Sequence, residues 1–143
     1  MNVLLPKNSI IMLIEDNEID NFINQRVLNN FSATIQILNF TNSSEALAYL
    51  RKNKPLPNLI LLNLHIRMSM GFEFLECYEK LKIEKKNTSI YVLSTFFCPS
   101  DLRLVKENAN CDGYIEKPLS MQKLFEEMEK KGTERTCCSK RAV

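Results

Sequence analysis

The sequence predicts an α/β domain built on a five-stranded parallel sheet with helices on both faces. Five short apolar segments alternate with segments of helical periodicity along a chain of 143 residues, of which 45% are hydrophobic. The segments at residues 10–14 and 59–62 are continuous apolar runs, as is typical of strands that are buried on both faces. Because a helix follows each strand, crossover connections place successive strands parallel to one another.

The first half of the chain contains two strand–helix pairs. Residues 10–14 form a continuous apolar run, and apolar residues then recur at helical spacing over residues 19–31. We expect a second strand at residues 34–38. Asn42 then precedes Glu45 by three positions, which is the spacing of a helix N-cap, so the second helix should begin there.

The second half of the chain repeats the same alternation. Further strands are expected at residues 59–62, 90–93 and 113–116. Apolar residues at helical spacing predict a helix over residues 72–81, and Pro99 suits the first turn of the next helix. Lys117 and Pro118 form a turn, after which Ser120 should cap the last helix.

The composition excludes several kinds of site. The three glycines, Gly71, Gly113 and Gly132, lie far apart, which excludes a dinucleotide fingerprint and a phosphate-binding P-loop. A single histidine, His65, excludes a multi-histidine metal site. The five cysteines include no CxxC pair, so we expect no structural zinc.

Charge and hydropathy predict the domain limits and the location. Residues 130–143 carry five basic residues and one acidic residue, whereas the whole chain has a net charge of +2. We expect a single domain over residues 8–131 and a basic, disordered tail over residues 132–143, with no nucleic-acid partner. No apolar segment approaches the roughly 20 residues of a membrane span, and residues 1–6 lack the basic start of a signal peptide. We therefore expect a cytoplasmic protein without a membrane partner; its oligomeric state stays open.

Polar residues follow four of the predicted strands. Glu15 and Asp16 follow the first strand, Asn63 the third, Ser94 the fourth and Lys117 the fifth. In parallel sheets, ligands bind at the carboxyl ends of the strands. Two adjacent carboxylates there suit a hard divalent cation, although acids also favour any helix N-terminus. A hydroxyl and a lysine could hold phosphoryl oxygens, although a lone lysine is more often an ordinary surface residue.

Four motifs stand in order along the chain: IMLIEDNEIDNFINQRVL at residues 11–28, LILLNLHIRMSMGFEFL at 59–75, VLST at 92–95 and DGYIEKPLS at 112–120. With these motifs the sequence resembles the receiver domain of two-component response regulators. The resemblance covers about residues 8–131. It implies the flavodoxin-like receiver fold, a doubly wound sheet in strand order 2-1-3-4-5.

The resemblance also implies a site. Receivers bind Mg²⁺ through an acid pair and a backbone carbonyl, which correspond here to Glu15, Asp16 and the carbonyl of His65. An aspartate at the end of the third strand accepts a phosphoryl group from a histidine kinase, and that position is Asn63.

The remaining implied residues bind the phosphoryl group and report its presence. Ser94 and Lys117 correspond to the residues that hold phosphoryl oxygens, and Tyr114 corresponds to an aromatic residue that changes rotamer on activation. The implied partner is a histidine kinase or another signalling protein.

The phosphoacceptor position departs from the family pattern. The lone pair of an amide nitrogen is delocalised into the carbonyl, so Asn63 is not a nucleophile. The change also removes a negative charge from the cation site, while His65 and Arg67 replace the usual loop residues. We therefore expect Mg²⁺ to bind weakly or not at all.

These features predict a pseudo-receiver in phosphorelay signalling, which is not an enzyme and acts through protein–protein interaction. The alternative is a conventional phosphorylatable receiver that carries an Asp-to-Asn substitution. A flavin-binding flavodoxin relative shares the topology, but the chain has no Trp and no Gly/Ser/Thr-rich loop after its first strand. Phe96 and Phe97 either pack beneath the following helix or form a docking patch.

Overall fold

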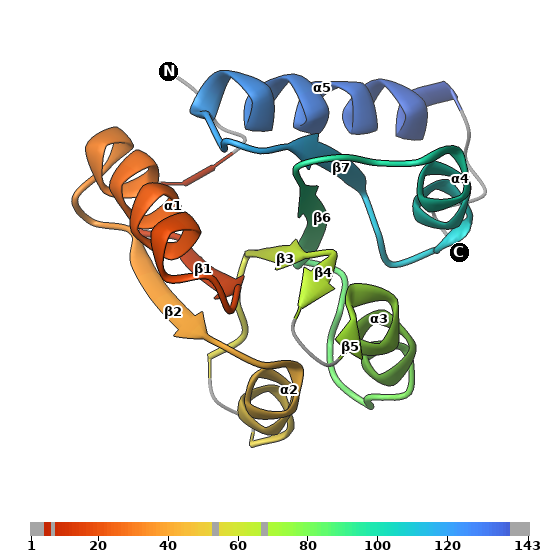
Figure 1. Cartoon of the computed structure of the whole chain (residues 1–143), viewed down its shortest axis with the longest axis horizontal. Helices are drawn as coiled ribbons and strands as arrows, with labels where there is room; N and C mark the ends of the chain where they lie inside the picture. Colours follow the sequence, from red (N-terminus) through yellow and green to blue (C-terminus); the bar gives the residue numbers. More distant parts are fainter. Residues whose placement is uncertain (1–4, 7, 53–54, 67–68, 138–143) are drawn as a thin grey trace.

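The computed structural model describes residues 5–6, 8–52, 55–66 and 69–137. Its main sheet consists of five parallel strands in the order β2-β1-β3-β6-β7 (Figure 1). These strands are β1 (Ile10–Ile14), β2 (Gln36–Phe40), β3 (Leu59–Asn63), β6 (Ser89–Ser94) and β7 (Gly113–Glu116). Numbered along the chain among themselves, they lie in the order 2-1-3-4-5, which confirms the predicted doubly wound topology.

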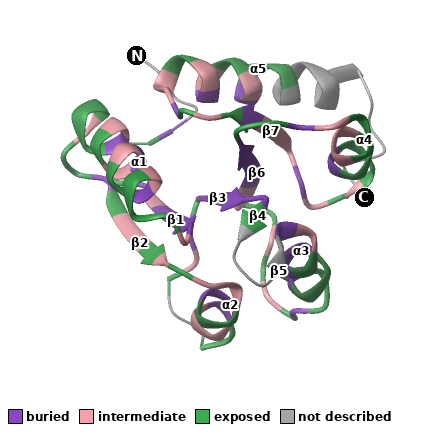
Figure 2. Cartoon of the chain, viewed as in Figure 1, coloured by how far each residue is buried: buried purple, intermediate pink, exposed green. Residues whose placement is uncertain are grey.

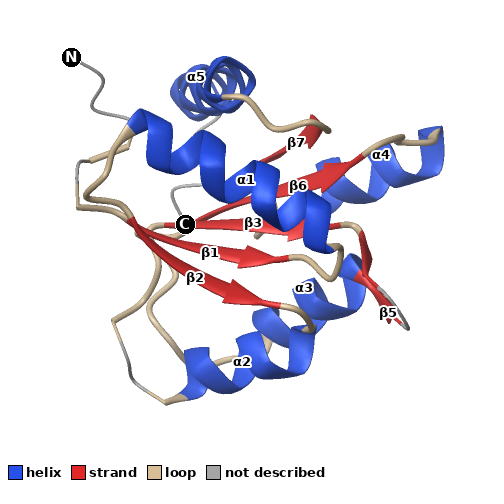
Figure 3. Ribbon diagram, turned by 60° about the vertical axis from the view of Figure 1, so that its left-hand side comes forward, coloured by secondary structure: helices blue, strands red, loops and turns tan. Residues whose placement is uncertain are grey.

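Helices cover both faces of the sheet. They are α1 (Glu18–Phe31), α2 (Ser43–Arg51), α3 (Gly71–Glu79), α4 (Pro99–Glu107) and α5 (Met121–Cys137). Figure 3 shows α1 and α5 on one face and α2, α3 and α4 on the other. Within the described ranges, no helix has the length and apolar character needed to cross a membrane.

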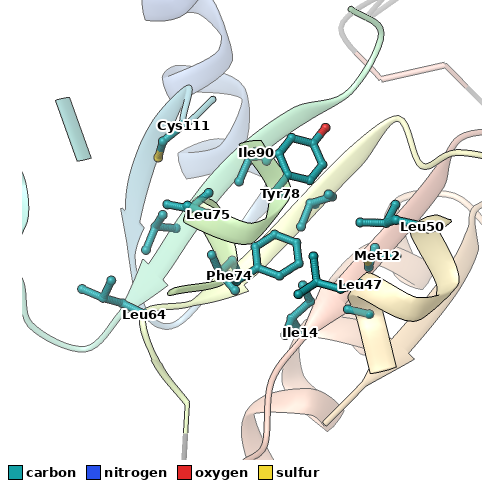
Figure 4. Packing of buried hydrophobic residues seen from close by; sticks show 14 of the residues in the cluster. Met12, Ile14, Leu47, Leu50, Leu64, Phe74, Leu75, Tyr78, Ile90 and Cys111 are labelled. Atoms are coloured by element: carbon teal, nitrogen blue, oxygen red, sulfur yellow. The ribbon is translucent and has the colours of Figure 1, made fainter. Parts of the chain in front are cut away.

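Two apolar clusters, one on each face, hold the layers together. Alternate residues of β1 divide between them, so that Met12 packs with α2 and α3 while Leu13 packs with α1 and α5. Figure 4 shows the first cluster, in which the rings of Phe74 and Tyr78 are stacked with their centroids 5.9 Å apart. Figure 2 shows the buried residues concentrated on the central strands. Each large side chain buried in this way contributes about 1.5–3 kcal/mol to folding.

Most predicted element boundaries agree closely with the structure, but β2 is shifted by two residues and α3 ends at Glu79, two residues earlier than predicted. Strand β2 begins at Gln36, two residues later than predicted, because its register with β1 pairs Ile10 with Gln36 and Ile14 with Phe40. Ile35 lies in the loop before the strand and is 6% exposed. Its apolar side chain packs into the core from that loop, which is why the sequence pattern predicted a strand there.

The expected helix N-termini are present. The Asn42 side chain accepts a hydrogen bond from the Glu45 N–H at 2.9 Å and caps α2. Pro99 occupies the first turn of α4, and Ser120 Oγ accepts from the Lys123 N–H at 3.1 Å before α5. Helix α5 continues to Cys137 and so enters the segment 132–143 that was expected to be a tail.

A short hairpin after β3 was not predicted from the sequence. It pairs β4 (His65–Ile66) with β5 (Ser69–Met70) in antiparallel fashion. Its two ends meet, because the Gly71 N–H donates a hydrogen bond to the Leu64 carbonyl at 2.6 Å. A Cβ on Gly71 would lie 3.1 Å from both the Asn63 carbonyl oxygen and Leu64 Cα, so this close approach favours glycine. Arg67 lies outside the described residues.

Candidate functional site

Glu15 is the central carboxylate at the carboxyl ends of the strands. It directly follows β1, is 1% exposed, and its backbone N–H donates to the Phe40 carbonyl of β2. Its Oε1 accepts a hydrogen bond from Lys117 Nζ at 2.9 Å. Its Oε2 accepts from Asn63 Nδ2 at 2.9 Å and from the Asn17 N–H at 3.2 Å. Burial raises the pKa of Glu15, and the Lys117 ammonium only partly offsets this effect.

Lys117 joins the end of β7 to the beginning of α1. Its Nζ lies 2.9 Å from Glu15 Oε1 and 2.7 Å from Asp20 Oδ2, and its side chain is only 10% exposed. Burial lowers the pKa of Lys117, but the hydrogen bonds to Asp20 and Glu15 outweigh that effect and raise it. Asp20 was not among the predicted site residues. The signal that could have revealed it is its position in the first turn of the helix that directly follows the Glu15–Asp16 pair.

Asn63 ends β3 with its side chain directed into the acidic site. Its Nδ2 donates to Glu15 Oε2 at 2.9 Å and to the His65 carbonyl at 3.1 Å, and it lies 3.5 Å from Asp16 Oδ1. Its Oδ1 accepts from the His65 N–H at 3.4 Å. The residue is 6% exposed. The structure therefore brings together Glu15, Asp16 and Asn63 from the strand ends, along with the His65 carbonyl that the resemblance implied.

Ser94 lies at the end of β6 and is 1% exposed. Its hydroxyl donates to the Phe96 carbonyl at 2.8 Å and accepts from the Phe96 N–H at 3.2 Å. The Ser94 carbonyl accepts from the Lys117 N–H at 2.8 Å, which links the ends of β6 and β7. The hydroxyl therefore stabilises the turn after β6 in this structure.

Tyr114 packs beside the same turn. Its ring lies against Phe97, with the ring centroids 5.0 Å apart and the planes at 59°. Phe97 is 8% exposed, whereas Phe96 is 67% exposed. Phe97 therefore packs in the core, as the first alternative expected, whereas Phe96 lies on the surface and the docking patch stays a hypothesis.

The oxygen atoms that could bind a cation lie around the side-chain amide nitrogen of Asn63, which is a hydrogen-bond donor. In the part of the chain that the structure describes, no three His, Cys, Asp or Glu side chains come together as a metal site. The oxygens of Glu15, Asp16 and the His65 backbone instead converge on the amide nitrogen of Asn63.

Comparison with known proteins identifies the family. Residues 11–129 match the family described as the response regulator receiver domain. The response regulator Rcp1 of Synechocystis is 30% identical over an alignment of 122 residues that covers 81% of this chain and 81% of that protein.

Solved structures show the same fold. A two-component response regulator from Cytophaga hutchinsonii superimposes with a TM-score of 0.77 at 22% identity, covering 90% of this chain and 100% of that one. The Mn²⁺-bound form of the response regulator Rcp1 gives 0.66 at 26% identity, covering 89% and 92%. Together with the match over residues 11–129, these similarities place the chain in the family of response regulator receiver domains.

Proposed function

We propose that this receiver domain is a pseudo-receiver, which acts in two-component signalling through protein–protein contacts and accepts no phosphoryl group. The observation that carries the proposal is Asn63 at the end of β3, facing Glu15. Phosphorylation of a receiver forms an acyl phosphate on a carboxylate oxygen. An amide offers no carboxylate oxygen, and its nitrogen lone pair is delocalised, so this intermediate cannot form on Asn63.

The residues of the site do not fit Mg²⁺ as they stand. Divalent cations take oxygen ligands, and the family includes an Mn²⁺-bound response regulator. Here the Glu15 and His65 oxygens accept hydrogen bonds from Asn63 Nδ2, so a cation at their point of convergence would meet N–H groups. We propose on this ground that Mg²⁺ binds weakly or not at all.

The side chains of the other residues assigned from the family are held in place by contacts within the protein. Lys117, the proposed phosphoryl-binding lysine, is held by two carboxylates, and the Ser94 hydroxyl is held by the Phe96 backbone. Tyr114, the proposed switch residue, packs on Phe97. Receiver domains partner with histidine kinases, so we propose a histidine kinase or another signalling protein as the partner.

A conventional receiver that carries an Asp-to-Asn substitution is the second candidate. The retained Glu15, Asp16 and Lys117 favour it, because these charged side chains remain at the strand ends. The loop after Asn63 favours the pseudo-receiver instead. A block of phosphotransfer needs only one substitution, whereas His65 and Arg67 also depart from the family pattern.

Intact-mass measurement after incubation with Mg²⁺ and acetyl phosphate tests the proposal. We expect no phosphoryl adduct on the wild-type chain and partial labelling of Asn63→Asp, which restores the carboxylate. A stoichiometric phosphoryl group on the wild-type chain would contradict the pseudo-receiver. An Asn63→Asp variant that stays unlabelled would contradict the assignment of Asn63 to the phosphoacceptor position.

A further inference from the structure

We propose that the Asn63 side-chain amide takes the place of a divalent cation, so that the acidic strand ends are held together without metal. The inference rests on the proposed function only in assigning Asn63 to the substituted acceptor position. It goes further in giving the amide a positive role. The Asn63 side chain then does two things: it removes the nucleophilic carboxylate, and its amide hydrogen-bonds to the oxygens that a cation would otherwise hold.

The first support is the convergence of oxygens from separate segments on one nitrogen. Glu15 and Asp16 follow β1, and the His65 carbonyl belongs to β4. Their oxygens lie 2.9, 3.5 and 3.1 Å, respectively, from Asn63 Nδ2. The two N–H groups can donate to the two nearer oxygens, while the Asp16 carboxylate lies at the edge of hydrogen-bonding distance.

The second support is that only one orientation of the amide suits its surroundings. If Oδ1 faced Glu15 and the His65 carbonyl, acceptors would oppose acceptors. In the observed orientation Oδ1 instead faces the His65 N–H, at 3.4 Å. Both ends of the 6% exposed amide therefore have partners, as a buried amide requires.

The third support is the charge that surrounds Asn63. The Lys117 ammonium contacts the carboxylates of Glu15 and of Asp20 in α1, and the Asp16 carboxylate lies 3.5 Å from Asn63 Nδ2. A fourth carboxylate at position 63 would face Glu15 Oε2, and the repulsion between the two would favour a bound cation or a shared proton. A neutral amide donates to the same oxygens and needs none. The wild-type fold should thus be indifferent to Mg²⁺.

Thermal unfolding in EDTA and in about 10 mM Mg²⁺ tests this inference, because a ligand that binds only the native state raises its melting temperature. We expect wild type to melt at the same temperature in both, within about 1 °C. Asn63→Asp should melt lower than wild type in EDTA and should gain about 5 °C or more in Mg²⁺. Asn87→Asp adds the same charge in an exposed turn and should show no Mg²⁺-dependent gain.

A second variant separates the loss of the donor from the gain of charge. Asn63→Ala removes the hydrogen bonds without adding a carboxylate, so it should melt below wild type in EDTA. Side-chain amide signals provide a direct readout: the Asn63 NH₂ resonances should exchange slowly in wild type and stay unbroadened when Mn²⁺ is added.

The outcomes distinguish this inference from the proposed function. If Mg²⁺ raised the melting temperature of wild type as much as that of Asn63→Asp, the inference that the Asn63 amide replaces a cation would be overturned. If the wild-type chain also stayed unlabelled by acetyl phosphate, the pseudo-receiver would still stand. Asn63→Asp that is as stable as wild type in EDTA would likewise overturn the inference.

Discussion

Lys117 and Glu15 lie 102 residues apart in the chain and form a buried ion pair, with Nζ 2.9 Å from Oε1. The pair joins the carboxyl ends of β7 and β1, which are not neighbours in the sheet. Since Lys117 also binds Asp20, one ammonium connects the sheet to the first turn of α1. The position of α1 on the sheet therefore depends in part on this one side chain.

Removal of the Lys117 ammonium should be costly. In Lys117→Met the Glu15 carboxylate stays buried without its cation, and we expect a loss of about 3 kcal/mol in the free energy of unfolding. Chemical denaturation measures this loss. Lys123→Met is the matched control, because Lys123 donates to backbone carbonyls at the surface and should cost about 1 kcal/mol or less. Equal losses in the two variants would contradict a special role for Lys117.

The raised pKa of Glu15 predicts a pH dependence of stability. Above the unfolded-state value of 4.5, the unfolded chain loses this proton while the native state keeps it up to the higher folded pKa. The native state binds more protons in that window, so the free energy of unfolding falls as the pH rises through it. Glu15→Gln should remove this fall, as urea unfolding across the window would reveal. If the free energy of unfolding of Glu15→Gln fell with pH as steeply as that of wild type, the pH dependence could not be assigned to Glu15.

Phe96 and Phe97 offer a matched test of burial. Phe97→Ala should lower the free energy of unfolding by about 3 kcal/mol, because it leaves a cavity beside Tyr114. Phe96 is 67% exposed, so Phe96→Ala should cost about 0.5 kcal/mol or less. Denaturant titration of both variants under the same conditions gives the comparison. Similar losses would show that Phe96 also packs in the folded protein.

Gly113→Ala should destabilise β7 by about 1–3 kcal/mol through overpacking. The new Cβ would lie 2.8 Å from Glu127 Oε1 and 3.0 Å from the Tyr91 ring. The Glu127 side chain can move, whereas Tyr91 is 2% exposed and fixed in the core. The double variant Gly113→Ala, Glu127→Ala should therefore recover little of the loss in thermal unfolding. Full recovery would assign the cost to Glu127 instead.

Much of the fold follows from local signals. The continuous apolar runs define β1 and β3, and the strand–helix alternation leads to parallel pairing. The error at β2 has a physical reason: Ile35 is apolar because it packs into the core, and the register with β1 decides where the strand begins. The hairpin escaped prediction because strands of two residues carry no periodicity.

The site was predictable as far as the topology determines it. Parallel strands bring Glu15, Asn63 and Lys117 to one edge of the sheet, and sequence order alone suffices to place them there. The partners of each side chain depend on tertiary geometry. The contact of Lys117 with Asp20 and that of the Ser94 hydroxyl with the Phe96 backbone need the positions of α1 and of the turn after β6.

The hydrogen bond from the Gly71 N–H to the Leu64 carbonyl, at 2.6 Å, holds the two ends of the intervening segment together. Because these ends are fixed to each other, a change in the length of the segment need not shift β3 or α3. Doubling the length of such a closed excursion adds only about 0.6 kcal/mol of closure entropy. A Gly-Ser insertion between positions 67 and 68 should therefore leave the melting transition nearly unchanged; a large drop would contradict this. This segment can therefore change in length at one edge of the site while β3 and α3 keep their positions.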